Sequence, residues 1–112
     1  MHPLEHHASF RAVIAAAPPL AELANAMRDS EQIVSSLATA CGDLAQGFAA
    51  PPGSRSRVQA HHRAWIAVRE IDRTVRLAQM RRLAPAKLVA KAQRAIDRAD
   101  VMIAALPGVL PS

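Results

Sequence analysis

The chain has 112 residues, 51% of them hydrophobic, and a formal net charge of +5 at pH 7. This length fits one domain that buries a core without disulfides, and the single cysteine, Cys41, excludes an intramolecular disulfide. Residues 1–20 lack the pattern of a signal peptide, and no apolar run approaches the ~18 residues of a membrane span. We therefore expect a cytoplasmic protein with no membrane partner.

Before Pro18 the sequence predicts one short helix at most, around Phe10 to Ala17. The next predicted helix covers residues 20–50, with Pro19 in its first turn, where a missing N–H costs little. The run Pro51-Pro52-Gly53 ends this helix.

Two further helices are predicted, over residues 54–83 and 85–106. Ser54 is placed to cap the first of them, and Pro85 is placed to begin the second. Pro107-Gly108 ends the last helix, and we expect the tail behind it to fray.

Apolar residues recur at intervals of three and four in all the long segments, and none shows strand-like alternation. The prediction is a single all-α domain: an antiparallel up-and-down four-helix bundle with a short first helix. Six further apolar residues widen the stripes and indicate a second buried face, which we interpret as a subunit interface. They are Val34, Ala38, Ala45, Val89, Val101 and Met102.

Two groups of residues lie on either side of the Pro51-Pro52-Gly53 break in an order that resembles that of a known family. The group before the break is Gln32, Leu44-Ala45 and Gly47, and the group after it is Val68, Glu70, Ile71 and Asp72. In this order and spacing, residues 20–106 resemble the four-helix-bundle proteins encoded in intervening sequences of bacterial 23S ribosomal RNA genes. That family has a Gln, an apolar stretch and Pro-x-Asn-Ile-Ala-Glu-Gly in its second helix, and Leu-x-Glu-Leu-Glu in its third. Its relatives include the accessory variability determinants of diversity-generating retroelements.

Three positions depart from the family signature: Cys41 replaces Pro, Asp43 replaces Asn and Gln46 replaces Glu. The first helix is also shorter than the family's and lacks its Val-Trp-Gln pattern. The resemblance implies an antiparallel bundle that assembles into a closed ring, a homopentamer. It also implies a possible role with nucleic acid, because the best-understood relatives bind nucleic acid and a reverse transcriptase.

The sequence offers little catalytic chemistry. His2 and His6 have the spacing of a helical metal pair, but no third ligand can be placed, so we expect no metal site and no cofactor. Glu70 and Asp72 are two residues apart on a helix and point away from one another. We expect ordinary ion pairs on the helix surface instead, Asp72 with Arg76 and Arg69, and Glu70 with Arg73. Cys41 lies on an apolar stripe, as a buried thiol does. We therefore expect the protein not to be an enzyme.

Charge is divided unevenly along the chain. Residues 1–50 hold two basic and five acidic residues, a net charge of −3, whereas residues 51–112 hold twelve and four, a net charge of +8. Helical spacing places seven of the basic residues on two stripes that suit RNA, DNA or an acidic protein. The stripes are Arg69, Arg73 and Arg76, and Lys87, Lys91, Arg94 and Arg98.

Two hypotheses of function remain open. The first is an oligomeric scaffold or interaction module. The second is a nucleic-acid-binding accessory protein that uses the two basic stripes. Because Phe10, Phe48 and Trp65 are the only aromatic residues of the Phe, Trp and Tyr types, we expect phosphate contacts rather than base stacking.

Overall fold

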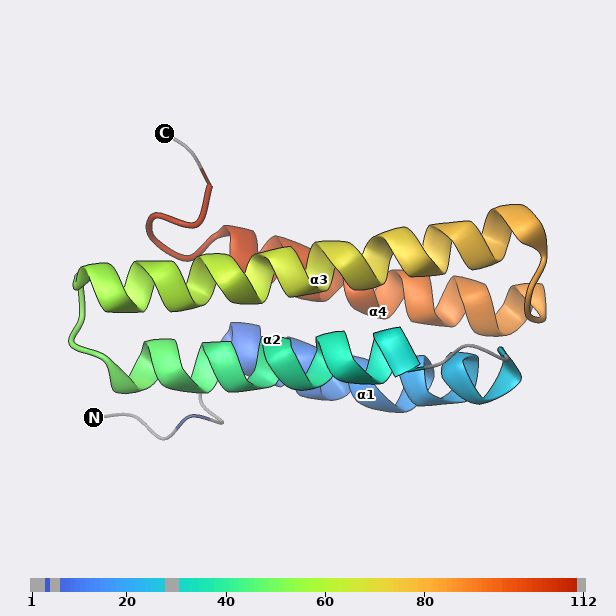
Figure 1. Ribbon diagram of the computed structural model, residues 1–112, viewed down its shortest axis with the longest axis horizontal. Coiled ribbons are helices and arrows are strands. Elements are labelled where there is room, and N and C mark those ends of the chain that lie inside the picture. Colours follow the sequence, from blue (N-terminus) through green and yellow to red (C-terminus); the bar gives the residue numbers. More distant parts are fainter. Residues whose placement is uncertain (1–3, 5–6, 28–30, 111–112) are drawn as a thin grey trace.

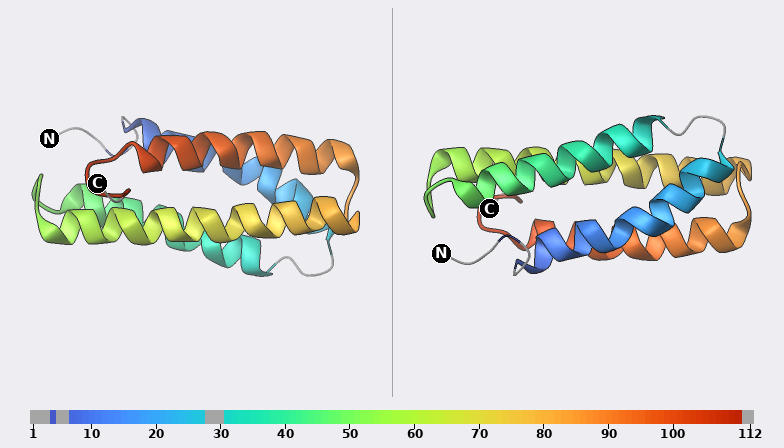
Figure 2. Two further views of the ribbon diagram at one scale, coloured as in Figure 1. Left: turned by 90° about the horizontal axis from the view of Figure 1, so that it is seen from above. Right: turned by 90° about the horizontal axis from the view of Figure 1, so that it is seen from below.

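The computed structural model describes Leu4, residues 7–27 and residues 31–110, and these hold four α-helices (Figure 1). The helices are α1 (Ala8–Ala26), α2 (Glu31–Ala49), α3 (Arg55–Arg81) and α4 (Ala86–Ala104). Each runs back along the one before it, and α1 also packs on α4 (Figures 1 and 2). The described residues contain no strand, so the predicted all-α, four-helix fold is confirmed.

The first helix is not short. α1 has 19 residues and contains both Pro18 and Pro19, so the predicted short helix and the predicted single helix over 20–50 are wrong. The apolar face of α1 continues across both prolines, and burying it outweighs their cost of ~3 kcal/mol each in a helix interior. The buried apolar residues of this face are Ala12, Val13, Ala16, Leu20, Leu23 and Ala24.

The prolines of α1 lie where the helix tolerates them. Pro18 and Pro19 cannot donate to the carbonyls of Ile14 and Ala15, but both of these residues are on the exposed side. Water can therefore reach the two unpaired carbonyls. Figure 2 shows the second half of α1 turning toward the start of α2, as a proline-containing helix often does. The helix ends at Ala26, and Met27 is extended.

α3 begins where the sequence predicted, after the Ser54 cap, but it ends earlier than predicted. The Ser54 hydroxyl accepts from the Arg57 N–H at 3.2 Å, which confirms the predicted cap. At the other end, Arg82 has the left-handed backbone angles φ 52° and ψ 46°, and the Leu83 N–H donates to the Ala78 carbonyl at 3.0 Å. These contacts end α3 at Arg81, two residues before the predicted boundary.

α4 begins directly after Pro85, whose carbonyl accepts from the N–H groups of Leu88 and Val89. The helix ends at Ala104, ahead of the Pro107-Gly108 turn. The prediction of a frayed tail is wrong as far as Val109, which is 1% exposed. Nδ1 of His62 donates to the Val109 carbonyl at 3.1 Å and ties this segment to α3.

Apolar residues from all four helices meet in one core along the axis of the bundle. The largest fully buried side chains in the helices are Leu20, Leu23, Ile33, Leu44, Ile71, Ile96 and Ile103. This arrangement leaves the outward faces of the helices as the surfaces available for function. Within the described residues, none of the helices is both long and apolar enough to traverse a bilayer.

Candidate functional site

The outward faces of the bundle differ sharply in charge. α1 and α2 together hold only four charged residues, Arg11, Glu22, Glu31 and Asp43. The other charged residues that the structure describes lie on α3, on α4 and in the hairpin that joins them. The candidate sites are therefore a basic surface on the α3–α4 side and an uncharged surface on the α1–α2 side.

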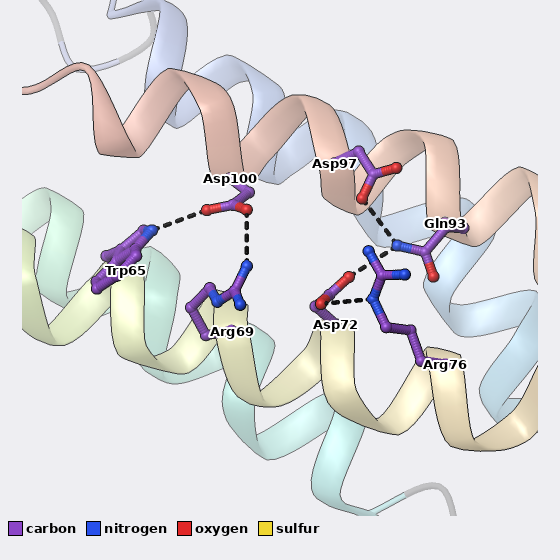
Figure 3. Close-up of polar contacts among 7 residues, drawn as sticks. All are labelled: Trp65, Arg69, Asp72, Arg76, Gln93, Asp97 and Asp100. Carbon is purple, nitrogen blue, oxygen red and sulfur yellow. Dashed lines mark hydrogen bonds and ion pairs between the residues drawn. The ribbon is translucent and has the colours of Figure 1, made fainter. Parts of the chain in front are cut away.

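A row of polar contacts joins α3 to α4, and it starts at Asp100 (Figure 3). The indole N–H of Trp65 donates to Oδ1 of Asp100 at 2.8 Å, and Arg69 donates to Oδ2 of the same carboxylate at 3.2 Å. The guanidinium of Arg69 also lies 5.9 Å from the centre of the Trp65 ring. Asp100 on α4 thus accepts hydrogen bonds from two side chains of α3, the Trp65 indole and the Arg69 guanidinium.

The second part of the row centres on Asp72, which is 6% exposed. Arg76 donates to one of its oxygens at 2.9 Å, and Nε2 of Gln93 donates to the other at 2.7 Å. The same Nε2 donates to Asp97 at 2.8 Å (Figure 3). Burial alone would raise the pKa of Asp72, but the hydrogen bonds from Gln93 and Arg76 and the charges of Arg76 and Arg69 lower it overall.

The predicted cationic stripe on α3 is engaged within the bundle. Arg76 pairs with Asp72, and Arg73 pairs with Glu70 at 3.6 Å, both of them expected pairs. Arg69 pairs with Asp100 on α4 at 3.2 Å rather than with Asp72. Asp100, Glu70 and Asp72 therefore offset much of the positive charge that Arg69, Arg73 and Arg76 would present to a polyanion.

The predicted cationic stripe on α4 is more open. Lys91 pairs with Glu22 of α1 at 3.4 Å. Lys87, Arg94 and Arg98 are exposed and make no ion pair with any residue that the structure describes. All four recur every three or four residues, so they share one outward face of α4. This face is the part of the predicted polyanion site that stays accessible.

The uncharged surface spans α1 and α2. Glu22 marks the flank of α1 that faces α4, and Asp43, 3.4 Å from Arg63, marks the flank of α2 that faces α3. On the opposite flanks the two helices carry only apolar side chains at spacings of four, three and four. These eight residues, here called the α1–α2 face, are Phe10, Ile14, Ala17, Ala21, Val34, Ala38, Cys41 and Ala45.

One ring contact sets the register across this face. The rings of His7 and Phe48 stack with centroids 3.7 Å apart. Because the helices are antiparallel, Ile14 then lies at the level of Cys41, and Ala21 at the level of Val34. Ile14 is 48% exposed and Val34, at one end of the face, is 57% exposed, so the face is open to solvent at both positions.

Only three of the six residues predicted to form a second buried face lie together on one outward surface. Val34, Ala38 and Ala45 lie on the α1–α2 face. Val89 is buried in the core of the single chain, and Met102 packs partly against that core, so both were assigned wrongly. Val101 is 65% exposed, but it lies on α4.

The histidines that the structure describes serve packing. His61 is 2% exposed, lies against the Phe48 ring and has no partner for Nε2. Burial lowers the pKa of His61, and the charges of Arg57 and His7 lower it further. In the described part of the chain no group of three or more His, Cys, Asp or Glu could hold a metal ion. His2 and His6 lie outside the described residues.

Cys41 is half-buried on the α1–α2 face, and burial raises the pKa of its thiol. A raised pKa disfavours the thiolate, which is the reactive form of cysteine. Glu70 and Asp72 are each engaged with an arginine, Arg73 and Arg76 respectively.

Two features of the α3–α4 contact were not predicted from the sequence. They are the Trp65–Asp100 hydrogen bond and the hydrogen bonds that Gln93 donates to Asp72 and Asp97. The Gln93–Asp97 pair has the i, i+4 spacing that could have indicated it. The Trp65–Asp100 pair spans 35 residues, so it depends on how the helices pack.

Comparisons with protein-family models, with curated proteins and with solved structures find no match to this chain. Function is therefore inferred from the geometry of the two surfaces.

Proposed function

We propose that the protein is a non-enzymatic cytoplasmic scaffold or interaction module that associates with copies of itself. The observation that carries this proposal is the α1–α2 face, which has no charged side chain although Ile14 and Val34 on it are exposed. The cores of subunit interfaces are depleted of charge in the same way, and a contiguous exposed apolar patch is unusual on a monomer. Burial of Ile14 and Val34 between copies would remove both side chains from water.

A ring is the form of assembly that we propose, and its number of five subunits rests on the family resemblance alone. A closed ring uses two different faces of each copy. The second face is a line along α3 that holds the exposed apolar side chains of Ile66, Leu77 and Met80, with the Arg73–Glu70 ion pair between Ile66 and Leu77. Ile66 and Leu77 are three helical turns apart and Met80 lies nearly one turn beyond Leu77, so the three share one side of α3. The α1–α2 face of one copy would meet this line on the next copy.

Light scattering coupled to size exclusion tests the proposal. We expect a mass several times that of the 12.0 kDa chain, and a variant Val34→Glu of monomeric mass. Val101→Glu is the matched control, because it makes the same change at an exposed valine on α4. A wild-type monomer at tens of micromolar contradicts the proposal, since interfaces of stable oligomers persist at that concentration. Equal dissociation by Val101→Glu would contradict the choice of face.

A second candidate function is that of a nucleic-acid-binding accessory protein, with RNA or DNA as the partner and an acidic protein as the alternative. Lys87, Arg94 and Arg98 favour it, because they share a face of α4 and make no ion pair with described residues. No acidic residue stands between Asp72 and Asp97 in the sequence, so the end of α3 and the start of α4 are strongly basic. Such a surface contacts phosphates without reading bases.

A further inference from the structure

A cavity of about 590 Å³ lies between the end of α3 and the start of α4. Its volume falls within the range of small-molecule sites, which is about 300–1,000 Å³. Alanine side chains and Val89 form the apolar part of its wall. The polar lining consists of two amides, Gln79 and Gln93, and two guanidinium groups, Arg82 and Arg94. Among the residues that the structure describes, no carboxylate lines it.

The two arginines of the cavity are free to bind an anion. Neither makes an ion pair with a residue that the structure describes. Two carboxylates of the α3–α4 row, Asp72 and Asp97, accept hydrogen bonds from Gln93. Two guanidinium groups on one apolar cavity suit a phosphate or a carboxylate, whose oxygens match the arrangement of their N–H donors.

The backbone conformation of Arg82 independently favours a functional role for this site. Arg82 is the only non-glycine residue with a positive φ among those the structure describes. It ends α3 in the left-handed conformation that helices usually assign to glycine at this position. An arginine is unfavourable there, and unfavourable backbone conformations cluster at sites of function. Here the conformation places the Arg82 side chain in the lining of the cavity.

Gln93 adds an unused hydrogen-bond acceptor. Its Nε2 is fixed by Asp72 and Asp97, which leaves its Oε1 buried and without a hydrogen-bond partner. Figure 3 shows this oxygen turned away from both carboxylates. A buried acceptor without a donor is unfavourable. Because this oxygen is buried, the cavity wall beside it must shift on binding for a ligand hydroxyl or amino group to supply the donor.

We propose that this cavity binds a small organic anion, a phosphate or a carboxylate that also carries a hydroxyl or amino group. Arg82 and Arg94 hold the anionic group, Oε1 of Gln93 accepts a hydrogen bond from the donor, and the wall around Val89 contacts the carbon atoms. The site uses one copy of the chain, so it does not depend on the self-association proposed above.

Isothermal titration calorimetry of the full chain tests the proposal with four probes: ribose 5-phosphate, gluconate, phenyl phosphate and inorganic phosphate. We expect saturable binding of ribose 5-phosphate or gluconate, and the stronger of the two identifies the anionic group. Phenyl phosphate, which has no hydroxyl or amino donor, should bind more weakly than ribose 5-phosphate if phosphate is preferred. No saturable heat from either hydroxylated probe up to about 10 mM, beyond the ~1 mM Kd of a weak site, overturns the proposal.

Three variants locate the binding. Arg94→Gln should weaken binding of the preferred probe about 10-fold or more, as expected for the loss of a charge-assisted hydrogen bond. Arg82→Gly should weaken it similarly while raising the Tm, because glycine relieves the left-handed backbone. Arg81→Gln is the matched control: it removes the same charge next to Arg82, but Arg81 does not line the cavity.

Two results with these variants would overturn the proposed binding site. Equal weakening by Arg81→Gln would mean that net charge alone attracts the probe, and the cavity would be discarded. Binding left intact by both Arg94→Gln and Arg82→Gly would overturn the proposal in the same way. Circular dichroism of each variant shows that a loss of binding is not a loss of fold.

Discussion

The imidazole of His61 fills the space that a side chain on Gly47 would need. A Cβ built on Gly47 would collide with Cδ2 and Nε2 of this ring. His61 cannot easily move away, because it is 2% exposed and packs against the Phe48 ring at a centroid distance of 4.5 Å. The close approach of α2 to α3 at this end of the bundle therefore depends on glycine at position 47.

Gly47→Ala should lower the free energy of unfolding by about 1–3 kcal/mol, the usual cost of overpacking a core. Gly42→Ala is the matched control on the same helix. Gly42 is exposed and has no atom within 4 Å of an added Cβ, so alanine should stabilise the protein there by about 0.5–1 kcal/mol. Urea denaturation measures both changes. If both alanine substitutions stabilise the protein equally, then a clash with His61 is not the reason for glycine at position 47.

A second substitution shows whether the clash is the cause. The double variant Gly47→Ala, His61→Ala should lose less stability than the sum of the two single variants, because the smaller side chain makes room for the new methyl group. Additive losses would place the cost of Gly47→Ala elsewhere in α2.

The stability of the protein should fall as the pH drops through the range where His61 titrates. The pKa of His61 lies below its ordinary value of 6.5 in the folded state, because of burial and the charges of Arg57 and His7. The unfolded chain therefore takes up the proton first as the pH falls, so this contribution to stability is complete above pH ~6.5 and is lost below it. His61→Leu should flatten the dependence of the urea midpoint on pH between about 7.5 and 5. An unchanged slope in this variant would exclude His61 as its source.

Asp72 should contribute more to stability than the other carboxylate that pairs on α3. Asp72→Asn replaces an oxygen that accepts from a charged or amide donor with an NH₂ group, which should cost about 1–3 kcal/mol in a buried site. Glu70→Gln is the control, because the Glu70–Arg73 pair is exposed and such pairs contribute about 0–1 kcal/mol. Thermal and urea unfolding compare the two. A smaller loss for Asp72→Asn than for Glu70→Gln would contradict this ranking.

The pKa of Asp72 adds a pH signature to that comparison. Its folded pKa lies below the ordinary value of 3.8, so its contribution is complete above that pH and is lost as the pH falls through the folded pKa. The difference in stability between wild type and Asp72→Asn should therefore shrink under strongly acidic conditions. A difference that did not change with pH would mean that the charge of Asp72 is not what stabilises the α3–α4 contact.

The sequence predicted the helix boundaries where their cause is local. The Ser54 cap and the start of α4 at Pro85 depend on groups within four residues. The first helix could not be predicted in this way, because Pro18 and Pro19 oppose a helix locally and only packing of the apolar face against the rest of the bundle overrides them. The early end of α3 depends on the left-handed backbone conformation of Arg82, which the conformational preference of a non-glycine residue disfavours.

The same division applies to the candidate sites. Helical spacing placed the four cations of α4 on one face and predicted the Arg76–Asp72 pair, which is four residues apart. It could not predict that Arg69 reaches Asp100, 31 residues away, or that the α1–α2 face stays uncharged across two helices. Both depend on which helices pack together and in which register, information that a helical wheel does not contain.

Binding to duplex DNA, if it occurs, should be weakened by reversing charge on α4. The double variant Arg94→Glu, Arg98→Glu removes two cations that make no ion pair with described residues, so each lost phosphate contact should reduce the salt slope by about 0.9. The loss should be similar for all DNA sequences, because phosphate contacts carry no base information. Fluorescence anisotropy at two or more salt concentrations measures the affinity and the slope.

Arg11→Glu, Arg55→Glu is the matched control for this double variant, because it makes the same change in net charge at two exposed arginines outside α4. If the control weakens binding as much as the α4 variant, the attraction comes from net charge alone and α4 is not the site. Binding that survives the α4 reversal would move the contact to another surface. If neither DNA nor structured RNA binds even at low salt, the basic face serves another partner, and self-association through the α1–α2 face is left as the better account of the protein.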